Sequence, residues 1–190
     1  MDDFPPDDRD ASPHPTPRRL HANLLRFCDA DAARDIAYGV PLSASASDAE
    51  KAAWVRHAAS ELERRFSPDT ARSVMMGCHC EDVCRLGEMK AWLGGLFGEA
   101  SSLEDFVDRV NEHGAGWYFE DGWLYTKFLW CECHMLRAIE RLPSMTWCHC
   151  TEGYTKALFQ HVLGCDVESE LVQSIKTGHD HCLVRIRVRR

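Results

Sequence analysis

The chain has 190 residues, of which 45% are apolar and 27% are charged, and this composition suits one globular domain with a buried core. Its formal net charge of -8 disfavours a nucleic-acid-binding protein, which needs a basic face to meet phosphates. No apolar run approaches the roughly 20 residues that span a bilayer, and the first residues, MDDFPPDDRD, lack the basic and apolar regions of a secretory signal. We therefore expect a cytoplasmic protein with no nucleic-acid or membrane partner.

The N-terminal half of the chain is predicted to be helical after a short arm. Residues 1–17 are acidic and rich in proline, which predicts a disordered arm. Residues 18–113 form a helical N-terminal region, because their apolar side chains recur at helical spacing. The clearest helix is expected at about residues 48–65, with Ser47 or Asp48 as its N-cap.

Strand-like sequence begins at residue 114. Aromatic residues around Glu120-Asp121-Gly122 predict a β-hairpin, and the sequence CECHMLRAIERL that follows predicts a helix. A second helix is expected to end at Gly164, before two final strands. The predicted fold class is therefore α+β: a helical N-terminal part followed by an antiparallel sheet with a packed helix, in one compact unit.

One stretch of the last third resembles known families. The sequence CHCTEGYTKALFQHVLGCDVESELVQSIKTGHDHCLVRI has a helix, a short link, a strand, a turn led by Gly178, and Cys182 opening the final strand. It resembles the closing module of the 4-vinyl reductase-type small-molecule-binding domain superfamily. It is also similar to the related L-2-amino-thiazoline-4-carboxylic acid hydrolase-like proteins. The resemblance covers roughly residues 115–188 and implies, for residues 114–190, a module that tends to bind small ligands or metals.

Ten cysteines are many for a protein expected in a reducing compartment, and they favour metal binding or redox chemistry over disulfides. Six of them form three Cys-x-Cys pairs, each with a histidine beside or between the thiols. Strand ends and helix starts converge easily in an α+β domain, so we expect the pairs to meet. The predicted metal ligands are Cys78, Cys80, Cys84, Cys131, Cys133, Cys148 and Cys150.

The predicted elements give these cysteines definite positions. The first and third pairs are expected at helix N-termini, where the helix dipole favours thiolate over thiol. Cys80 and Cys84 are four residues apart and would share one helix face. The middle pair is expected at the end of a strand, where alternate residues share a face.

The cofactor that these thiols predict is zinc, with an iron–sulfur cluster as the alternative. Seven sulfurs exceed the four ligands of one tetrahedral zinc, so spectator cysteines or a dinuclear site remain open. The spacing matches neither common zinc ribbons nor ferredoxins. Cys28 and Cys165 stand alone and are expected to be packing residues, whereas Cys182 is equally a packing or a site residue. His134 is a further possible ligand.

Three functions remain open. The first is a cytoplasmic metal-binding protein with a possible small-molecule ligand. The second, which the resemblance implies, is a metal- or thiol-dependent hydrolase of a small cyclic amide or thiazoline. Glu132 and Glu152 lie next to thiol pairs, and either could serve as a base if the metal holds a water, although a helix-start acid or a solvated side chain is the commoner role. The third is a thiol redox module. The sequence assigns no catalytic residue and no oligomeric state.

Overall fold

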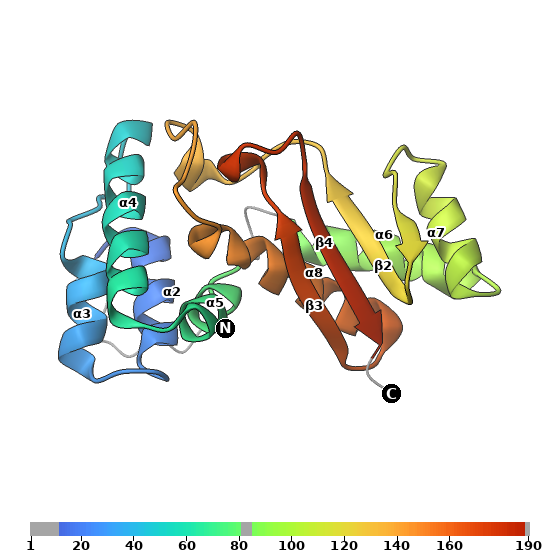
Figure 1. Ribbon diagram of the computed structural model, residues 1–190, viewed down its shortest axis with the longest axis horizontal. Coiled ribbons are helices and arrows are strands. Elements are labelled where there is room, and N and C mark those ends of the chain that lie inside the picture. The colour runs from blue at the N-terminus through green and yellow to red at the C-terminus, as the bar shows by residue number, and fades with distance from the viewer. Residues whose placement is uncertain (1–11, 81–84, 189–190) are drawn as a thin grey trace.

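The structure is a computed structural model that describes residues 12–80 and 85–188. These residues form seven α-helices and one four-stranded antiparallel sheet, which confirms the α+β class (Figure 1). The helices are α2 (Pro15–Leu24), α3 (Ala30–Tyr38), α4 (Asp48–Arg65), α5 (Pro68–Met76), α6 (Leu86–Glu99), α7 (Leu103–Asn111) and α8 (His149–Leu163). The strands are β1 (Tyr118–Glu120), β2 (Trp123–Phe128), β3 (Val167–Gln173) and β4 (Cys182–Val188).

Helices α2 to α5 gather on one side of the molecule, and the sheet lies on the other with α6 and α8 behind it (Figure 1). The strand order is β1-β2-β4-β3. Helix α5 packs against α8, and α4 contacts the short 3-10 turn η1 (His134–Leu136). The helical region and the sheet module therefore contact each other along α5 and α4. Among the described residues, no helix combines the length and apolar character needed to cross a membrane.

The predicted helix at 48–65 forms with the predicted bounds. Ser47 is its N-cap: the Ser47 hydroxyl accepts a hydrogen bond from the Glu50 N–H, and the Glu50 carboxylate accepts one from the Ser47 N–H. This reciprocal capping box satisfies two of the N–H groups that a helix start leaves without partners. The hairpin is also confirmed, because Asp121 and Gly122 both have positive φ angles, 51° and 75°, as a two-residue hairpin turn requires.

Residues 12–17, which the sequence assigned to the arm, pack on the helical region. Helix α2 begins at Pro15, and the side chains of Ser12, His14 and Thr16 are buried. The Ser12 hydroxyl donates to the Leu42 carbonyl, and His14 Nδ1 accepts from the Thr16 N–H as the helix N-cap. These contacts anchor the chain from residue 12 onward, while residues 1–11 lie outside the described part.

Buried His14 gives the fold a pH dependence. Burial, His134, Lys51 and two arginines lower the pKa of His14 from 6.5 to about 4. The unfolded chain therefore binds a proton below pH 6.5 that the folded chain does not bind until about pH 4. We expect the free energy of unfolding to fall as the pH drops through this window, with a slope approaching about 1.4 kcal/mol per pH unit for one proton.

Thermal melts between pH 7.5 and about pH 4 measure this effect. The control is His14→Asn, which keeps an N-cap acceptor but does not titrate. It should flatten the pH dependence in this window. If stability changes with pH at the same slope in the wild type and in His14→Asn, then His14 does not cause the pH dependence.

The predicted helix at CECHMLRAIERL is wrong: only the 3-10 turn η1 forms there. Lys176 explains the difference. Its ammonium group donates to the carbonyls of Leu136 and Ile139, at 3.0 and 2.5 Å, and its own carbonyl accepts from the Leu142 N–H at 2.7 Å. A distant side chain thus satisfies backbone groups that a local helix would otherwise pair.

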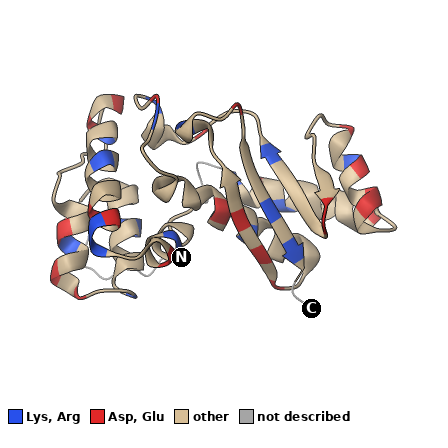
Figure 2. Ribbon diagram, in the orientation of Figure 1, with Lys and Arg blue, Asp and Glu red and all other residues tan. Residues whose placement is uncertain are grey.

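The sheet has two chemically different ends. Cys182, at the start of β4, lies opposite Phe128 at the end of β2, whereas Ile186 lies opposite Leu124. We call the end with Cys182 and Phe128 the first end of the sheet; the loops next to it contain cysteines. We call the opposite end, where the β1–β2 hairpin turns, the second end. On the outer face, the arginines of β4 pair with the glutamates of β3 (Figure 2); the pairs are Arg185–Glu170 and Arg187–Glu168.

Candidate thiol site

Helices α5 and α8 cross at a contact that only glycine permits. A Cβ atom on Gly153 would lie 1.9 Å from the Met76 carbonyl oxygen and within 2.7 Å of two further backbone atoms of Met76. The end of α5 therefore lies directly against the first turn of α8. Cys78 follows α5 by two residues, and Cys148 and Cys150 stand at the start of α8. This crossing brings the two CHC sequences together.

The middle pair joins them from the first end of the sheet, where β2 leads into its loop. Burial is the main cause of the raised pKa of Cys133 and of Cys148. Thiolate charges at Cys131 and Cys80 add to the first shift, and charges at Cys182 and Cys131 add to the second. Charges that affect one another's pKa in this way belong to the same region of the fold. We call the group the thiol cluster; its members are Cys78, Cys80, Cys131, Cys133, Cys148, Cys150 and Cys182.

Hydrogen-bond donors point at several of these sulfur atoms. The contacts are Arg19 Nη1 to Cys80 at 3.4 Å, Asn23 Nδ2 to Cys78 at 3.5 Å, Ser174 Oγ to Cys148 at 3.1 Å and the Ile175 N–H to Cys182 at 3.4 Å. As thiols, Cys78 and Cys28 each also donate to the carbonyl four residues earlier, that of Val74 at 3.3 Å and that of Leu24 at 3.4 Å. Donors directed at sulfur favour the thiolate form in the cluster.

Burial opposes that form. It raises the pKa of Cys78 and Cys148 to about 12, that of Cys133 to about 11 and that of Cys150 well above its usual value. At the start of α8, burial therefore opposes the thiolates that the helix N-terminus was expected to favour at Cys148 and Cys150, and Cys78 follows the end of α5 instead of standing at a helix start. Burial outweighs the dipole of α8, so a positive charge is needed to displace the protons.

Trp147 contributes a buried donor to the cluster. Its side chain is 3% exposed and packs edge-on against Trp54. Its indole N–H has no hydrogen-bond partner of ordinary geometry within residues 12–80 and 85–188. It lies close enough to Cys133 to lower the pKa of that thiol, against the larger effect of burial. A thiolate at Cys133 would give this N–H the acceptor that a neutral thiol provides only weakly.

Glu152 is an ionised anchor and not an available base. Its side chain is wholly buried and accepts hydrogen bonds from Arg72 Nε at 3.0 and 3.2 Å, His149 Nδ1 at 2.8 Å and Ser169 Oγ at 3.2 Å. Burial would raise its pKa, but the bonds from His149 and Arg72 outweigh burial and lower it to about 2. The network ties α5 and β3 to the first turn of α8. The other predicted base, Glu132, is exposed and accepts from Trp130.

The structure changes several predicted positions. Cys80 itself is not helical, the next helix that the structure describes is α6 from Leu86, and Cys84 lies outside the described residues. The middle pair follows β2 in a loop, at Cys131 and Cys133, rather than ending the strand. His134 stacks on His14 with 6.1 Å between ring centroids, and its buried Nδ1 has no hydrogen-bond partner in the described part of the chain.

Sequence reasoning left three side chains of the site unassigned or missed them. Cys182 belongs to the cluster, and Ser174 and Arg19 donate to its sulfurs. The sequence signal for Cys182 was its position at the start of the last strand. That strand pairs with β2, and Cys131 and Cys133 follow the end of β2. As the side chains stand, the described residues contain no group of three or more His, Cys, Asp or Glu arranged to hold a metal ion.

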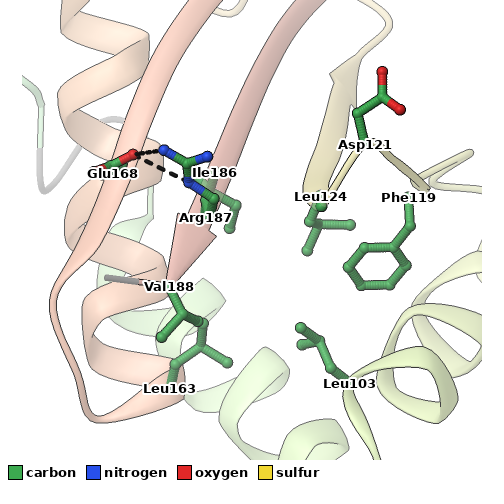
Figure 3. A pocket seen from close by; sticks show the side chains of 10 residues that line it. Leu103, Phe119, Asp121, Leu124, Leu163, Glu168, Ile186, Arg187 and Val188 are labelled. Carbon is green, nitrogen blue, oxygen red and sulfur yellow. Dashed lines mark hydrogen bonds and ion pairs between the residues drawn. The ribbon is translucent and has the colours of Figure 1, made fainter. Parts of the chain in front are cut away.

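A separate cavity of about 740 Å³ opens at the second end of the sheet, between β2, β4 and the start of α7 (Figure 3). Phe119, Leu124, Leu163 and Val188 point into it, with the Glu168–Arg187 ion pair on one side; Leu103, Asp121, Gly122 and Ile186 complete the lining. Ile186 is the lining residue of β4 nearest to Cys182, and it lies four residues along the strand from that thiol, a distance of about 13 Å. The cavity and the thiol cluster are therefore distinct sites.

Comparison with known proteins gives the chain a family. The model of the family of unknown function DUF6144 matches residues 18–190. Neither a curated protein nor a solved structure matches the chain. Because the match covers both the helical region and the sheet module, the chain belongs to the family of unknown function DUF6144.

Proposed function

We propose that this protein binds a metal through its thiol cluster, with zinc as the expected metal and an iron–sulfur centre as the alternative. The observation that carries the proposal is the set of N–H and O–H donors directed from separate segments at the sulfur atoms of three buried cysteines and of half-buried Cys80. Such donors stabilise thiolates, and thiolates are the ligands that zinc and iron–sulfur clusters take from cysteine. Cysteines that serve only as packing need no such donors.

The first ligand set that we propose is centred on Cys150. Burial is the main cause of its raised pKa, and Cys78, Cys80 and Cys133 add to it with Cys148. The four thiols Cys78, Cys80, Cys133 and Cys150 match the ligand number of a tetrahedral zinc or a four-cysteine cluster. The orphaned indole N–H of Trp147 beside Cys133 fits this assignment. The bound metal would supply the positive charge that the buried sulfurs need to lose their protons.

Metal analysis of the anaerobically purified chain tests this function. We expect at least one equivalent of zinc or iron, with visible absorbance only if an iron–sulfur centre is present. Cys150→Ser should lose the metal equivalent held by this set of four thiols, whereas the matched control Cys165→Ser, outside the cluster, should keep it. A folded, metal-free wild type whose thiols all react with a labelling reagent would contradict the proposal. Reversible disulfides would then become the favoured function.

We also propose that the cavity at the second end of the sheet binds a small, largely apolar ligand. Its volume of about 740 Å³ falls within the usual range of ligand sites, and its lining is mostly apolar. The resemblance to small-molecule-binding domains supports the same use. Its separation from the thiol cluster gives the hydrolase alternative no support, because a thiol-held metal would not reach a substrate bound there.

Binding of an apolar fluorescent probe tests the cavity. Phe119→Asp should weaken the binding at least several-fold, because Phe119 points into the cavity from β1. Leu129→Asp is the control, since Leu129 is also an exposed apolar residue but does not line the cavity. Equal effects of the two substitutions would place the probe elsewhere.

We propose a cytoplasmic location. All nine cysteines within the described residues are free thiols, and thiol ligands persist best where the surroundings are reducing. The net charge of -8 supports the expected absence of a nucleic-acid partner.

A further inference from the structure

The side chain of Ser174 contacts two buried cysteines, Cys148 and Cys182, that lie far apart in the sequence. Its hydroxyl donates to Cys148 Sγ at 3.1 Å and accepts from the Cys182 thiol at 3.8 Å. All three side chains are nearly closed to solvent, with exposed fractions of 5%, 0% and 6% for Cys148, Ser174 and Cys182. Because both sulfurs contact one hydroxyl oxygen, they are near neighbours, although one begins α8 and the other begins β4.

Two backbone N–H groups hold Ser174 and Cys182 in this arrangement. The Lys176 N–H donates to the Ser174 hydroxyl at 3.1 Å, and the Ile175 N–H donates to Cys182 Sγ at 3.4 Å. The Ser174 oxygen thus has its acceptor capacity filled by the Lys176 N–H and the Cys182 S–H, so its own proton is directed at Cys148. Each sulfur also has a donor, the Ser174 hydroxyl for Cys148 and the Ile175 N–H for Cys182, which would stabilise its thiolate once the thiol proton is displaced.

We propose that Cys148 and Cys182 form a dithiol that binds a thiophilic ion through both sulfurs, and that Ser174 positions them. The proposal rests on metal binding by the thiol cluster and adds to it a second subsite, beside the set centred on Cys150. With a divalent cation, both S–H bonds break, two metal–sulfur bonds form and two protons pass to solvent, with no change of oxidation state. Soft thiol ligands select zinc and similar ions over magnesium or calcium.

A trivalent arsenical, phenylarsine oxide, tests the pair without any bound metal. It condenses with two neighbouring thiols, forming two arsenic–sulfur bonds and releasing water. After treatment of the metal-free full chain, peptide mapping should find an arsenic bridge between Cys148 and Cys182. The bridge should be lost in Cys182→Ser and kept in Cys165→Ser. Bridges confined to other cysteine pairs would overturn the proposal, because they would show that these two sulfurs do not act together.

Zinc affinity supplies the second measurement. Ser174→Ala should weaken the binding of one zinc equivalent by about 10- to 100-fold, the usual cost of losing a ligand's hydrogen-bond partner, and Cys182→Ser, which removes a ligand, should weaken it more. Ser174→Thr, which restores the hydroxyl, should recover it, and a merely structural effect of Ser174 would not follow the hydroxyl. Unchanged zinc affinity in Cys182→Ser would refute the second subsite.

The two measurements separate the two proposals. A wild type that forms the Cys148–Cys182 arsenic bridge but binds no zinc or iron would contradict metal binding and leave the dithiol standing. A wild type that binds metal but forms no such bridge would contradict only the dithiol.

Discussion

Gly153→Ala should destabilise the protein by about 3 kcal/mol or more, because the new Cβ would overlap the Met76 carbonyl at 1.9 Å. The clash is with backbone, so no side-chain rotation relieves it, and α5 and α8 must move apart. That movement would also separate Cys78 from Cys150 and so weaken metal binding. Chemical denaturation measures the stability, and metal content measures the consequence for the cluster.

Gly94→Ala is the matched control for this substitution. Gly94 lies inside helix α6, where a Cβ would meet nothing within 4 Å. Alanine is the better helix former, so this variant should gain about 0.5–1 kcal/mol. A Gly153→Ala protein as stable as Gly94→Ala would mean that the helices do not cross as described.

Arg72→Met should cost about 3–5 kcal/mol of stability, because it leaves a wholly buried carboxylate without its cation. Glu152 would keep only His149 and Ser169, and its pKa would rise from about 2 because the hydrogen bonds and the charge of Arg72, which lower it, would be lost. The variant should therefore be least stable at high pH relative to the wild type, where Glu152 must stay ionised. Denaturant titrations at several pH values measure both effects.

Arg64→Met is the control, because it removes an ion pair at the surface instead of one that holds a buried carboxylate. Arg64 pairs with Glu61 on the exposed side of α4, and such pairs contribute only about 0–1 kcal/mol. The double variant Arg72→Met/Glu152→Met should recover much of the loss, since an apolar pair replaces the stranded charge. If Arg72→Met costs no more than Arg64→Met, the buried network does not hold α5 to α8.

Local chemistry in the sequence predicts much of this fold. Ser47 with Glu50, Asp121 with Gly122, and Gly164 after α8 each fix an element boundary within a few residues of themselves. The failed helix after β2 depends on Lys176, some forty residues away, whose ammonium takes the carbonyls that a helix would use. No local pattern carries that contact.

The candidate site was also only partly predictable from the sequence. Cys-x-Cys spacing singled out six of the seven described members of the thiol cluster, but Cys182 has no neighbouring thiol in the sequence to mark it. Its membership depends on strand pairing and on Ser174, which are long-range features. The effect of burial on the thiols at the start of α8 was not predicted, because the helix position is visible in sequence, whereas the depth of burial is not.

X-ray absorption spectroscopy at the edge of the metal found in the anaerobically purified chain tests the central claim most directly, because it identifies the atoms bound to the metal. For zinc, thiolate ligation predicts sulfur scatterers at about 2.3 Å. Only nitrogen or oxygen scatterers, at about 2.0–2.2 Å, would contradict a metal site built from the thiol cluster.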